Sequence, residues 1–212
     1  MKKYVNLFVF VFMIGACLSQ GRAQTKSAVS YKNPVVDIAM PDPTVIKATD
    51  GYFYVYATES TRNVPIMKSK DLVEWTYCNT AFTNKTRPRF EPKAGIWAPD
   101  INYINGKYVL YYAMSVWGGE QTCGIGVATA DSPQGPFTDH GKMFRSNEIG
   151  VQNSIDPSLL QYEGRNYLVW GSFRGIYVIE LTADGLSIMP GAKKKRIAGT
   201  AFEAVYIHKH GD

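Results

Sequence analysis

The chain has 212 residues, of which 45% are hydrophobic and 19% charged, and its formal net charge is +5 at pH 7. Three of its basic residues lie within the first 24, so the rest holds 20 basic against 18 acidic residues. A balance of +2 is too small for a nucleic-acid-binding surface. Only Cys78 and Cys123 remain after residue 24, outside any Cys/His cluster, which excludes a zinc motif and leaves their pairing open.

Residues 1–24 have the layout of a signal peptide for export. Two lysines precede a run, residues 5–14, that is almost wholly apolar and too short for a stable membrane span. The tetrad that ends at Cys17 also fits a loose lipoprotein box, and a lipid on Cys17 would attach the protein to a membrane. We favour soluble export, to the periplasm or the medium, over lipidation.

Beyond residue 30 helical periodicity is nearly absent, and short strand-like runs are the strongest pattern. Each run is aromatic and β-branched, and Gly, Asn, Asp or Pro bounds it, which is typical of strands between tight turns. In chain order the runs are residues 52–56, 108–112, 167–170 and 176–179. The pattern predicts an all-β fold.

These strands belong to a repeated unit of about 50 residues, the size of a propeller blade with its three or four strands. In each repeat an acidic residue precedes a short apolar run, a turn glycine and a second strand. The turn glycines are Gly51, Gly106, Gly164 and Gly211. The acids are Asp42, Asp100, Asp156 and Glu203. The sequence thus predicts a β-propeller with one acid in register in each repeat.

The first strand of a propeller blade lies nearest the central axis, so the four acids are expected to converge at one end of the funnel. Like charges gathered there repel, and a protein keeps such a cluster where a site needs it. Each acid can instead cap a turn, as Asp often does before Pro or Ser. Four acids in register favour a functional cluster.

The number of repeats is small for a closed propeller, which typically needs at least four blades. The chain holds three repeats and the first strand of a fourth, about three and a half blades. We therefore interpret residues 30–212 as the N-terminal part of a longer propeller domain.

Acids that face each other across a cleft are the usual machinery of glycoside hydrolysis. One protonates the leaving oxygen and the other activates water, and a separation of about 6.5–9.5 Å gives inversion because a water fits between. A third acid nearby raises the pKa of the proton donor by repulsion. Three acids from different blades meet that specification.

Seven segments, taken in this order, resemble glycoside hydrolase family 43. They are MPDPTVI, KSKDLVEW, WAPDI, GKYVLYY, GIGVATADSPQGPF, NSIDPSLL and FEAVYI. The family consists of five-bladed propeller enzymes that cleave arabinan, xylan side chains and related pentose polymers. The segment VWGSFRGIYVIEL is most similar to endo-arabinanase-like members.

The resemblance implies an inverting, endo-1,5-α-L-arabinanase-like hydrolase of plant cell-wall polysaccharide that is monomeric when complete. An exo-acting α-L-arabinofuranosidase or β-xylosidase of the same family is the near alternative. A non-catalytic carbohydrate-binding propeller, or an inactive truncated one, is the alternative from another class.

The family's catalytic acids carry over by motif. Asp42 in PDP matches the general base, Glu203 in FEAVYI matches the general acid, and Asp156 in SIDPS matches the acid that tunes and orients the donor. Pro41 and Pro43 restrict the backbone around Asp42, and a base that holds a water in line needs such fixed geometry.

Three further residues are expected to bind substrate. Trp97 can stack on a sugar face or pack within its blade, and Ser172 and Phe173 are similar to substrate-lining positions of arabinanases. Asp100 is expected to form hydrogen bonds rather than transfer protons. Trp117 lies in a glycine-rich loop that can reach the cleft, and packing within the loop is the favoured expectation.

Two tryptophans, Trp75 and Trp170, are expected in the core. The chain departs from the family in one respect, because Ala204 and Val205 follow the general acid where a proline is usual. Arabinanase-like members often bind calcium through a histidine of the last blade. Because the repeats of this segment do not include that last blade, we expect no metal or cofactor here, and a structural calcium only in a full-length protein.

Overall fold

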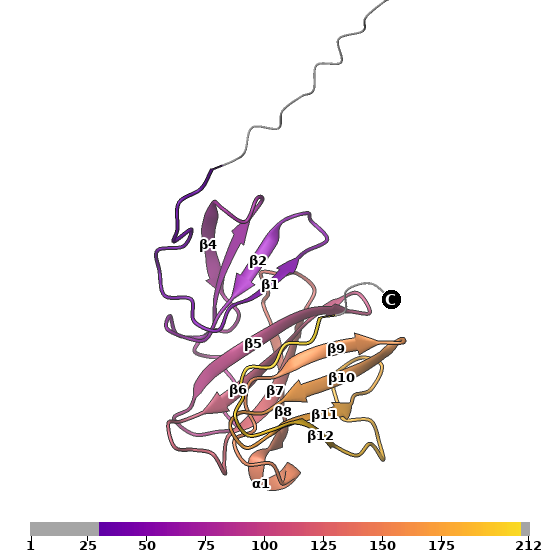
Figure 1. Cartoon of the computed structure of the whole chain (residues 1–212). Coiled ribbons are helices and arrows are strands. Elements are labelled where there is room, and N and C mark those ends of the chain that lie inside the picture. The colour runs from indigo at the N-terminus through magenta and orange to yellow at the C-terminus, as the bar shows by residue number, and fades with distance from the viewer. Residues whose placement is uncertain (1–29, 209–212) are drawn as a thin grey trace, which may run out of the picture. The chain divides into compact units, whose positions relative to one another are not determined.

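The computed structural model of this protein describes residues 30–208, and the expected signal peptide and Cys17 lie outside them. Its strands form three four-stranded antiparallel sheets, each with its strands in chain order (Figure 1). No helix in residues 30–208 combines the length and the hydropathy of a membrane span. The predicted all-β propeller architecture is confirmed, with each sheet forming one blade.

The three blades follow one another along the chain. Blade 1 comprises β1 (Thr44–Lys47), β2 (Phe53–Tyr56), β3 (Pro65–Ser69) and β4 (Trp75–Thr80). Blade 2 comprises β5 (Gly95–Ile104), β6 (Lys107–Ser115), β7 (Gly124–Ala130) and β8 (Thr138–Arg145). A single helical turn, α1 (Ser146–Ile149), leads out of blade 2. Blade 3 comprises β9 (Ser158–Tyr162), β10 (Arg165–Trp170), β11 (Ile176–Glu180) and β12 (Lys195–Ala198).

The inner hairpins of blades 2 and 3 form at the predicted glycines. Between β5 and β6 the two loop residues, Asn105 and Gly106, both have positive φ angles of 48° and 83°. Between β9 and β10, Glu163 and Gly164 have φ angles of 49° and 73°. Two positive φ angles in a two-residue loop match the twist of antiparallel strands, which is why glycine recurs there.

The core lies between the blades, and β6 shows how one strand serves two interfaces. Successive side chains of a strand point to opposite faces. Leu110 and Tyr112 belong to the cluster shared with blade 1, while Val109 and Tyr111 belong to the cluster shared with blade 3. These four side chains are at most 1% exposed. The near-continuous apolar run of this strand follows from its burial on both faces.

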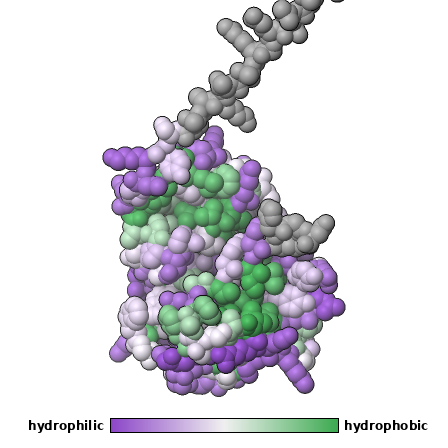
Figure 2. Space-filling model, viewed as in Figure 1, coloured by the Kyte–Doolittle hydropathy of each residue, from purple (hydrophilic) through white to green (hydrophobic). Residues whose placement is uncertain are grey.

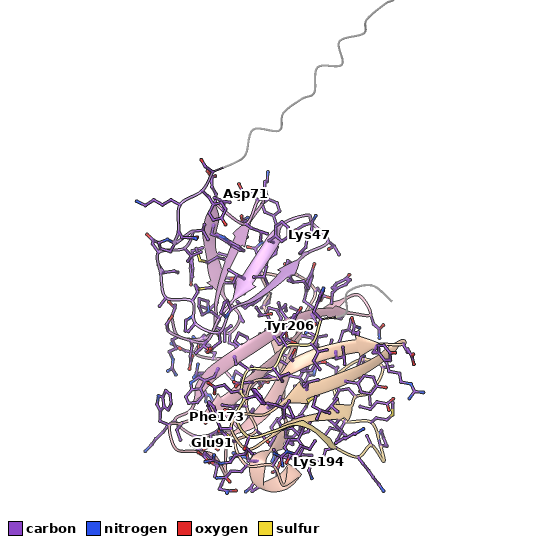
Figure 3. The ribbon with its side chains drawn as sticks, in the orientation of Figure 1. Lys47, Asp71, Glu91, Phe173, Lys194 and Tyr206 are labelled. Atoms are coloured by element: carbon purple, nitrogen blue, oxygen red, sulfur yellow. The ribbon has the colours of Figure 1, made fainter. Side chains whose placement is uncertain are left out.

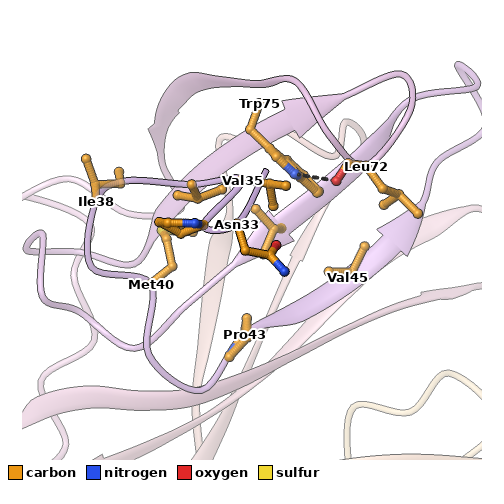
Figure 4. Close-up of a pocket in the computed structure, with 11 residues that line it drawn as sticks. Asn33, Val35, Ile38, Met40, Pro43, Val45, Leu72 and Trp75 are labelled. Atoms are coloured by element: carbon orange, nitrogen blue, oxygen red, sulfur yellow. Dashed lines mark hydrogen bonds between the residues drawn. The ribbon is translucent and has the colours of Figure 1, made fainter. Parts of the chain in front are cut away.

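The two tryptophans expected in the core have different positions. Trp170 is fully buried between blades 2 and 3, as predicted. Trp75 is only partly buried, so that expectation was wrong. It begins the outermost strand of blade 1, and its indole nitrogen donates a hydrogen bond of 3.0 Å to the carbonyl oxygen of Leu72 (Figure 4).

Trp75 lines an apolar cavity of about 730 Å³ on the flank of blade 1, together with the segment that precedes β1. Exposed apolar side chains on this flank include Ile38, Val45 and Leu72, and Figure 2 shows it as a green area in the upper part of the view. No blade of the described residues covers this flank, which is why Trp75 remains partly accessible.

The segment that follows blade 3 differs from expectation. The segment 202–211, predicted as the first strand of a fourth blade, is described as far as residue 208, and up to that point it has no strand partner among residues 30–208 and forms no ladder. It is held to blade 3 where the backbone N–H of Phe173 donates to the carbonyl of Phe202 at 2.9 Å.

The pairing of the two cysteines, left open by the sequence, is resolved. Cys78 and Cys123 are both free thiols, and burial raises the pKa of each.

Candidate active site

Two of the predicted site residues occupy the same position in different blades. Asp42 and Asp156 each lie two residues before the first strand of a blade, with φ angles of 49° and 56°, and each precedes a proline. A positive φ is uncommon for residues other than glycine, although Asp is among the more tolerant. Backbone strain of this kind concentrates at functional sites.

Blade 2 departs from the register that spacing predicts. Asp100 pairs with Tyr111, five residues after the turn glycine, just as Thr44 pairs with Tyr56 in blade 1. Asp100 therefore corresponds to Thr44, and Ala98, with a φ of 41° and a following proline, corresponds to Asp42. The prediction that the acids share one register was wrong for Asp100, because it lies six residues before its turn glycine, whereas Asp156 lies eight residues before its own.

The four acids nevertheless converge. Asp42, Asp100, Asp156 and Glu203 all line one cleft of about 1100 Å³, between the ends of the three inner strands and the segment 203–206. Phe173 and Tyr206, labelled in Figure 3, also belong to its lining. The sequence-predicted substrate residues Trp97 and Ser172 lie there as well.

Asp42 is exposed in this cleft and is held by one hydroxyl group. Thr58 Oγ1 donates to Asp42 Oδ2 at 2.5 Å, and Thr58 Oγ1 in turn accepts a hydrogen bond of 2.7 Å from the backbone N–H of Ala98. The backbone N–H of Thr58 donates to the carbonyl of Pro41 at 2.9 Å. Side chain and backbone of Thr58 thus both fix the segment that carries Asp42.

Asp156 is half-buried and differs electrostatically from Asp42. Its pKa is raised from 3.8 to about 6, mainly by burial and to a lesser extent by the nearby carboxylates of Glu203 and Asp42. The backbone N–H of Ala204 donates to Asp156 Oδ2 at 3.2 Å and opposes this rise. The three acids are therefore close enough to interact through their charges.

Glu203 is exposed, and the hydroxyl of Ser172 donates to its Oε2 at 3.0 Å. Ser172 itself is only 1% exposed, so its hydroxyl is committed to the glutamate. The next residue, Phe173, is 46% exposed and presents its ring to the cleft. The two residues predicted together as substrate-lining thus occupy different positions, Ser172 within the wall and Phe173 on its surface.

Asp100 forms hydrogen bonds between blades, in agreement with prediction. Its Oδ2 accepts bonds of 2.7 Å from the backbone N–H of Leu159 in β9 and of 2.7 Å from the side-chain amide of Asn102. The residue is 8% exposed, and burial raises its pKa to about 6. Asp100 therefore ties the inner strand of blade 2 to that of blade 3.

Two tryptophans form an aromatic rim on the cleft. The ring centroids of Trp97 and Trp117 lie 5.5 Å apart with an interplanar angle of 51°. Trp117 is 94% exposed, so the expectation that it packs in its loop was wrong. Trp97 combines the two roles considered for it, because it packs on the buried residues Ala113 and Ile155 and also lines the cleft.

Behind Thr58, a buried ion pair supports the cleft, and no sequence motif pointed to it. The side chains of Glu59 and Arg87 are 9% and 7% exposed and form a two-pronged contact. Glu59 also accepts hydrogen bonds from the backbone N–H groups of Ile96 and Asn63, at 2.9 and 2.8 Å. Burial alone would raise the pKa of Glu59, but Arg87 and these N–H groups hold it below its usual value.

Metal ligation finds little support in the described part of the chain. Residues 30–208 contain no group of three or more His, Cys, Asp or Glu side chains placed to hold a metal ion. His208 is exposed. The structural calcium expected of a full-length protein stays a prediction.

Comparison with known proteins places this fold and cleft in context. Residues 31–212 match the family described as Glycosyl hydrolases family 43. The chain is 38% identical over 140 residues to the extracellular endo-alpha-(1->5)-L-arabinanase 1 of Bacillus subtilis, covering 62% of this chain and 43% of that protein. It is 32% identical over 180 residues to the arabinan endo-1,5-alpha-L-arabinosidase A of Aspergillus niger, covering 81% and 55%.

Solved structures agree with these relatives. An exo-1,5-alpha-L-arabinanase from a bovine ruminal metagenomic library superposes with a TM-score of 0.70 at 30% identity, covering 86% of this chain and 65% of that one. The Cellvibrio cellulosa alpha-L-arabinanase complexed with arabinohexaose has a TM-score of 0.67 at 28% identity, covering 76% and 54%. The chain spans about half the length of the curated relatives it matches.

Proposed function

This chain belongs to glycosyl hydrolases family 43, and from that membership we propose that it carries the catalytic acids of an inverting hydrolase that cleaves arabinan. The observation that supports the proposal is the cleft itself. Asp42, Asp156 and Glu203 reach it from three separate parts of the chain, and each has a different environment. Hydrolysis of a glycosidic bond needs acids in such unequal environments.

Asp42 is proposed as the general base. Its Oδ2 is engaged by Thr58, while Oδ1 receives no hydrogen bond from residues 30–208 and is open to a water in the cleft. That water loses a proton to Asp42 as its oxygen attacks the anomeric carbon. Attack from the face opposite the leaving group inverts the configuration.

Glu203 is proposed as the general acid that gives its proton to the leaving oxygen. Ser172 holds one oxygen of Glu203, which leaves the other to carry the proton. Asp156 lies near enough for their charges to interact. Asp156 also accepts the backbone N–H of Ala204, the residue after Glu203, so its proposed role is to orient the segment that carries the proton donor.

The substrate class follows from the relatives and the rim. Both curated relatives named above are arabinan-cleaving enzymes, and one is extracellular, so we propose export and an arabinan of plant cell walls as substrate. Trp97, Trp117 and Phe173 provide aromatic surfaces on which sugar rings can stack. Endo action is preferred, and exo action is the second candidate because one structural neighbour is an exo-1,5-alpha-L-arabinanase.

The test uses the protein expressed from its complete gene, with linear 1,5-α-L-arabinan as substrate. Glu203→Gln and Asp42→Asn are each expected to lower kcat by about 10²–10⁴-fold, the usual contribution of one proton-transfer group, while arabinan binding persists. NMR of the first product should show the inverted anomer. A retained anomer, or an Asp42→Asn variant with wild-type kcat, would overturn the assignment.

Two further observations separate the alternatives. Endo action lowers the viscosity of an arabinan solution before many reducing ends appear, whereas exo action releases one product from the start. A carbohydrate-binding propeller without catalysis would bind arabinan, release no sugar, and be indifferent to Glu203→Gln.

A further inference from the structure

We infer that Thr58 is a positioning residue for the base and that it fixes which oxygen of Asp42 takes the proton. The hydroxyl of Thr58 is itself oriented by a backbone N–H group of the neighbouring blade. The inference rests on the proposed function and deepens it. Thr58 lies two residues after β2, and it belongs to none of the segments that carry the family resemblance. Its hydroxyl nevertheless contacts the residue on which water activation depends.

The direction of both hydrogen bonds is determined. A threonine hydroxyl has one proton and two acceptor lone pairs. Because the N–H of Ala98 can only donate, Thr58 Oγ1 accepts at 2.7 Å and turns its own proton to Asp42 Oδ2 at 2.5 Å. The hydroxyl cannot reverse and leave the carboxylate unpaired. Asp42 Oδ2 is thereby occupied, and Oδ1 becomes the oxygen that faces water.

A comparison with Asp156 shows that this arrangement repeats across the fold. The donor to Asp156 is the N–H of Ala204, which has a φ of 51°. The donor behind Thr58 is the N–H of Ala98, which has a φ of 41°. In both cases a left-handed alanine further along the chain supports the acid of the preceding blade. The link to Asp156 is direct, and the link to Asp42 passes through Thr58.

Thr58 is itself held rigidly, which a positioning role requires. Its N–H is bonded to the carbonyl of Pro41 at 2.9 Å, and the next residue, Glu59, is anchored in the buried pair with Arg87. Glu59 also accepts the N–H of Ile96, two residues before Ala98. Thr58 and the segment that carries the N–H of Ala98 are therefore both anchored through the buried carboxylate of Glu59.

The chain offers a matched control on the other side of the reaction. Ser172 bonds to the general acid Glu203 as Thr58 bonds to the base Asp42. A good leaving group, such as a dinitrophenolate, departs without protonation, so it removes the need for an acid while the need for a base remains. A defect at Thr58 should therefore persist with such a substrate, whereas a defect at Ser172 should largely disappear.

The experiment compares Thr58→Val, Thr58→Ser and Ser172→Ala in the protein expressed from its complete gene. Each is assayed on an arabino-oligosaccharide and on its 2,4-dinitrophenyl glycoside. Loss of a hydrogen bond to a charged group predicts a fall in kcat of about 10–100-fold for Thr58→Val on both substrates, with KM within about twofold. Thr58→Ser keeps the hydroxyl and should recover most of kcat. Ser172→Ala should be impaired mainly on the oligosaccharide.

Specific outcomes would overturn the inference. They are a wild-type kcat for Thr58→Val, a change confined to KM, a defect that the dinitrophenyl glycoside relieves, or a Thr58→Ser variant as impaired as Thr58→Val. Thermal unfolding confirms that each variant folds, and Thr58→Ala removes the same hydroxyl if the valine is not accommodated. Asp42→Asn is measured alongside. Wild-type kcat for that variant would refute the proposed base itself, whereas its inactivity beside a fully active Thr58→Val would refute only the relay.

Discussion

Replacing the buried Asp100 by asparagine should stabilise the protein at neutral pH and leave it unchanged in acid. Burial raises the pKa of Asp100 from 3.8 to about 6. The folded protein therefore keeps this proton up to about pH 6, while the unfolded chain releases it near pH 4. Stability contributed by the protonated form is fully present below pH 4 and is lost as the pH rises through 6. The pKa difference corresponds to about 3 kcal/mol.

The geometry explains why asparagine is the informative substitution. The two short hydrogen bonds that Asp100 accepts from Leu159 and Asn102 end on the same oxygen, Oδ2. The single carbonyl oxygen of an asparagine can keep both bonds without a buried charge. The free energy of unfolding at pH 8 should thus exceed that of the wild type by up to about 3 kcal/mol. Asp100→Ala also removes the buried charge but leaves the N–H of Leu159 unpaired, so it should be about 1–3 kcal/mol less stable than Asp100→Asn at every pH.

Urea unfolding of both variants and the wild type, followed by tryptophan fluorescence from pH 4 to pH 8, measures these differences. Asp156 also has a pKa raised to about 6, but it titrates in all three proteins and cancels in the comparison. A constant difference between Asp100→Asn and the wild type across this range would refute the reasoning. A variant less stable than the wild type at pH 8 would refute it as well.

Three other predictions concern separate parts of the molecule. Glu59→Ala leaves Arg87 as an uncompensated buried charge and should lower the free energy of unfolding by about 3–5 kcal/mol, measured with urea. Trp117→Ala should raise KM for arabinan several-fold in steady-state kinetics, yet change the unfolding free energy by less than about 0.5 kcal/mol, because the ring is 94% exposed. Iodoacetamide should modify both Cys78 and Cys123 in denaturant without a reductant, and mass spectrometry showing neither modified would contradict their free state.

Local sequence patterns predicted the blades well because the turn glycines and the strand runs are local signals. The register of blade 2 was missed because the acids were matched by their order in the repeats, although Asp100 lies six residues before its turn glycine and Asp42 and Asp156 lie nine and eight before theirs. The alignment therefore matched Asp100 to Asp42, where the structure matches Ala98. Convergence on one cleft was still predicted correctly, because a shift of two residues along β5 leaves Asp100 in the lining of the cleft.

Other features depend on contacts between distant parts of the chain. Thr58 gains its position from Ala98, forty residues away, and its own surroundings in the sequence form no motif. Trp75 and Trp170 both lie in strands, β4 and β10, and the sequence around them does not show which strand another blade covers. A covering blade buries Trp170, whereas Trp75 remains partly accessible. Trp117 follows a strand whose side chains are almost all buried, yet its loop carries it out to the rim.

The left-handed residues that face the cleft have a meaning for evolution. Asp42, Ala98, Asp156 and Ala204 all line the cleft, and none of them is paired in a strand ladder, although Ala98 lies within β5. A mutation at any of them changes the chemistry of the cleft without disturbing a strand pair. Each of these positions can therefore accept a new side chain that faces the cleft. Two of them, Ala98 and Ala204, carry only a methyl group in this chain.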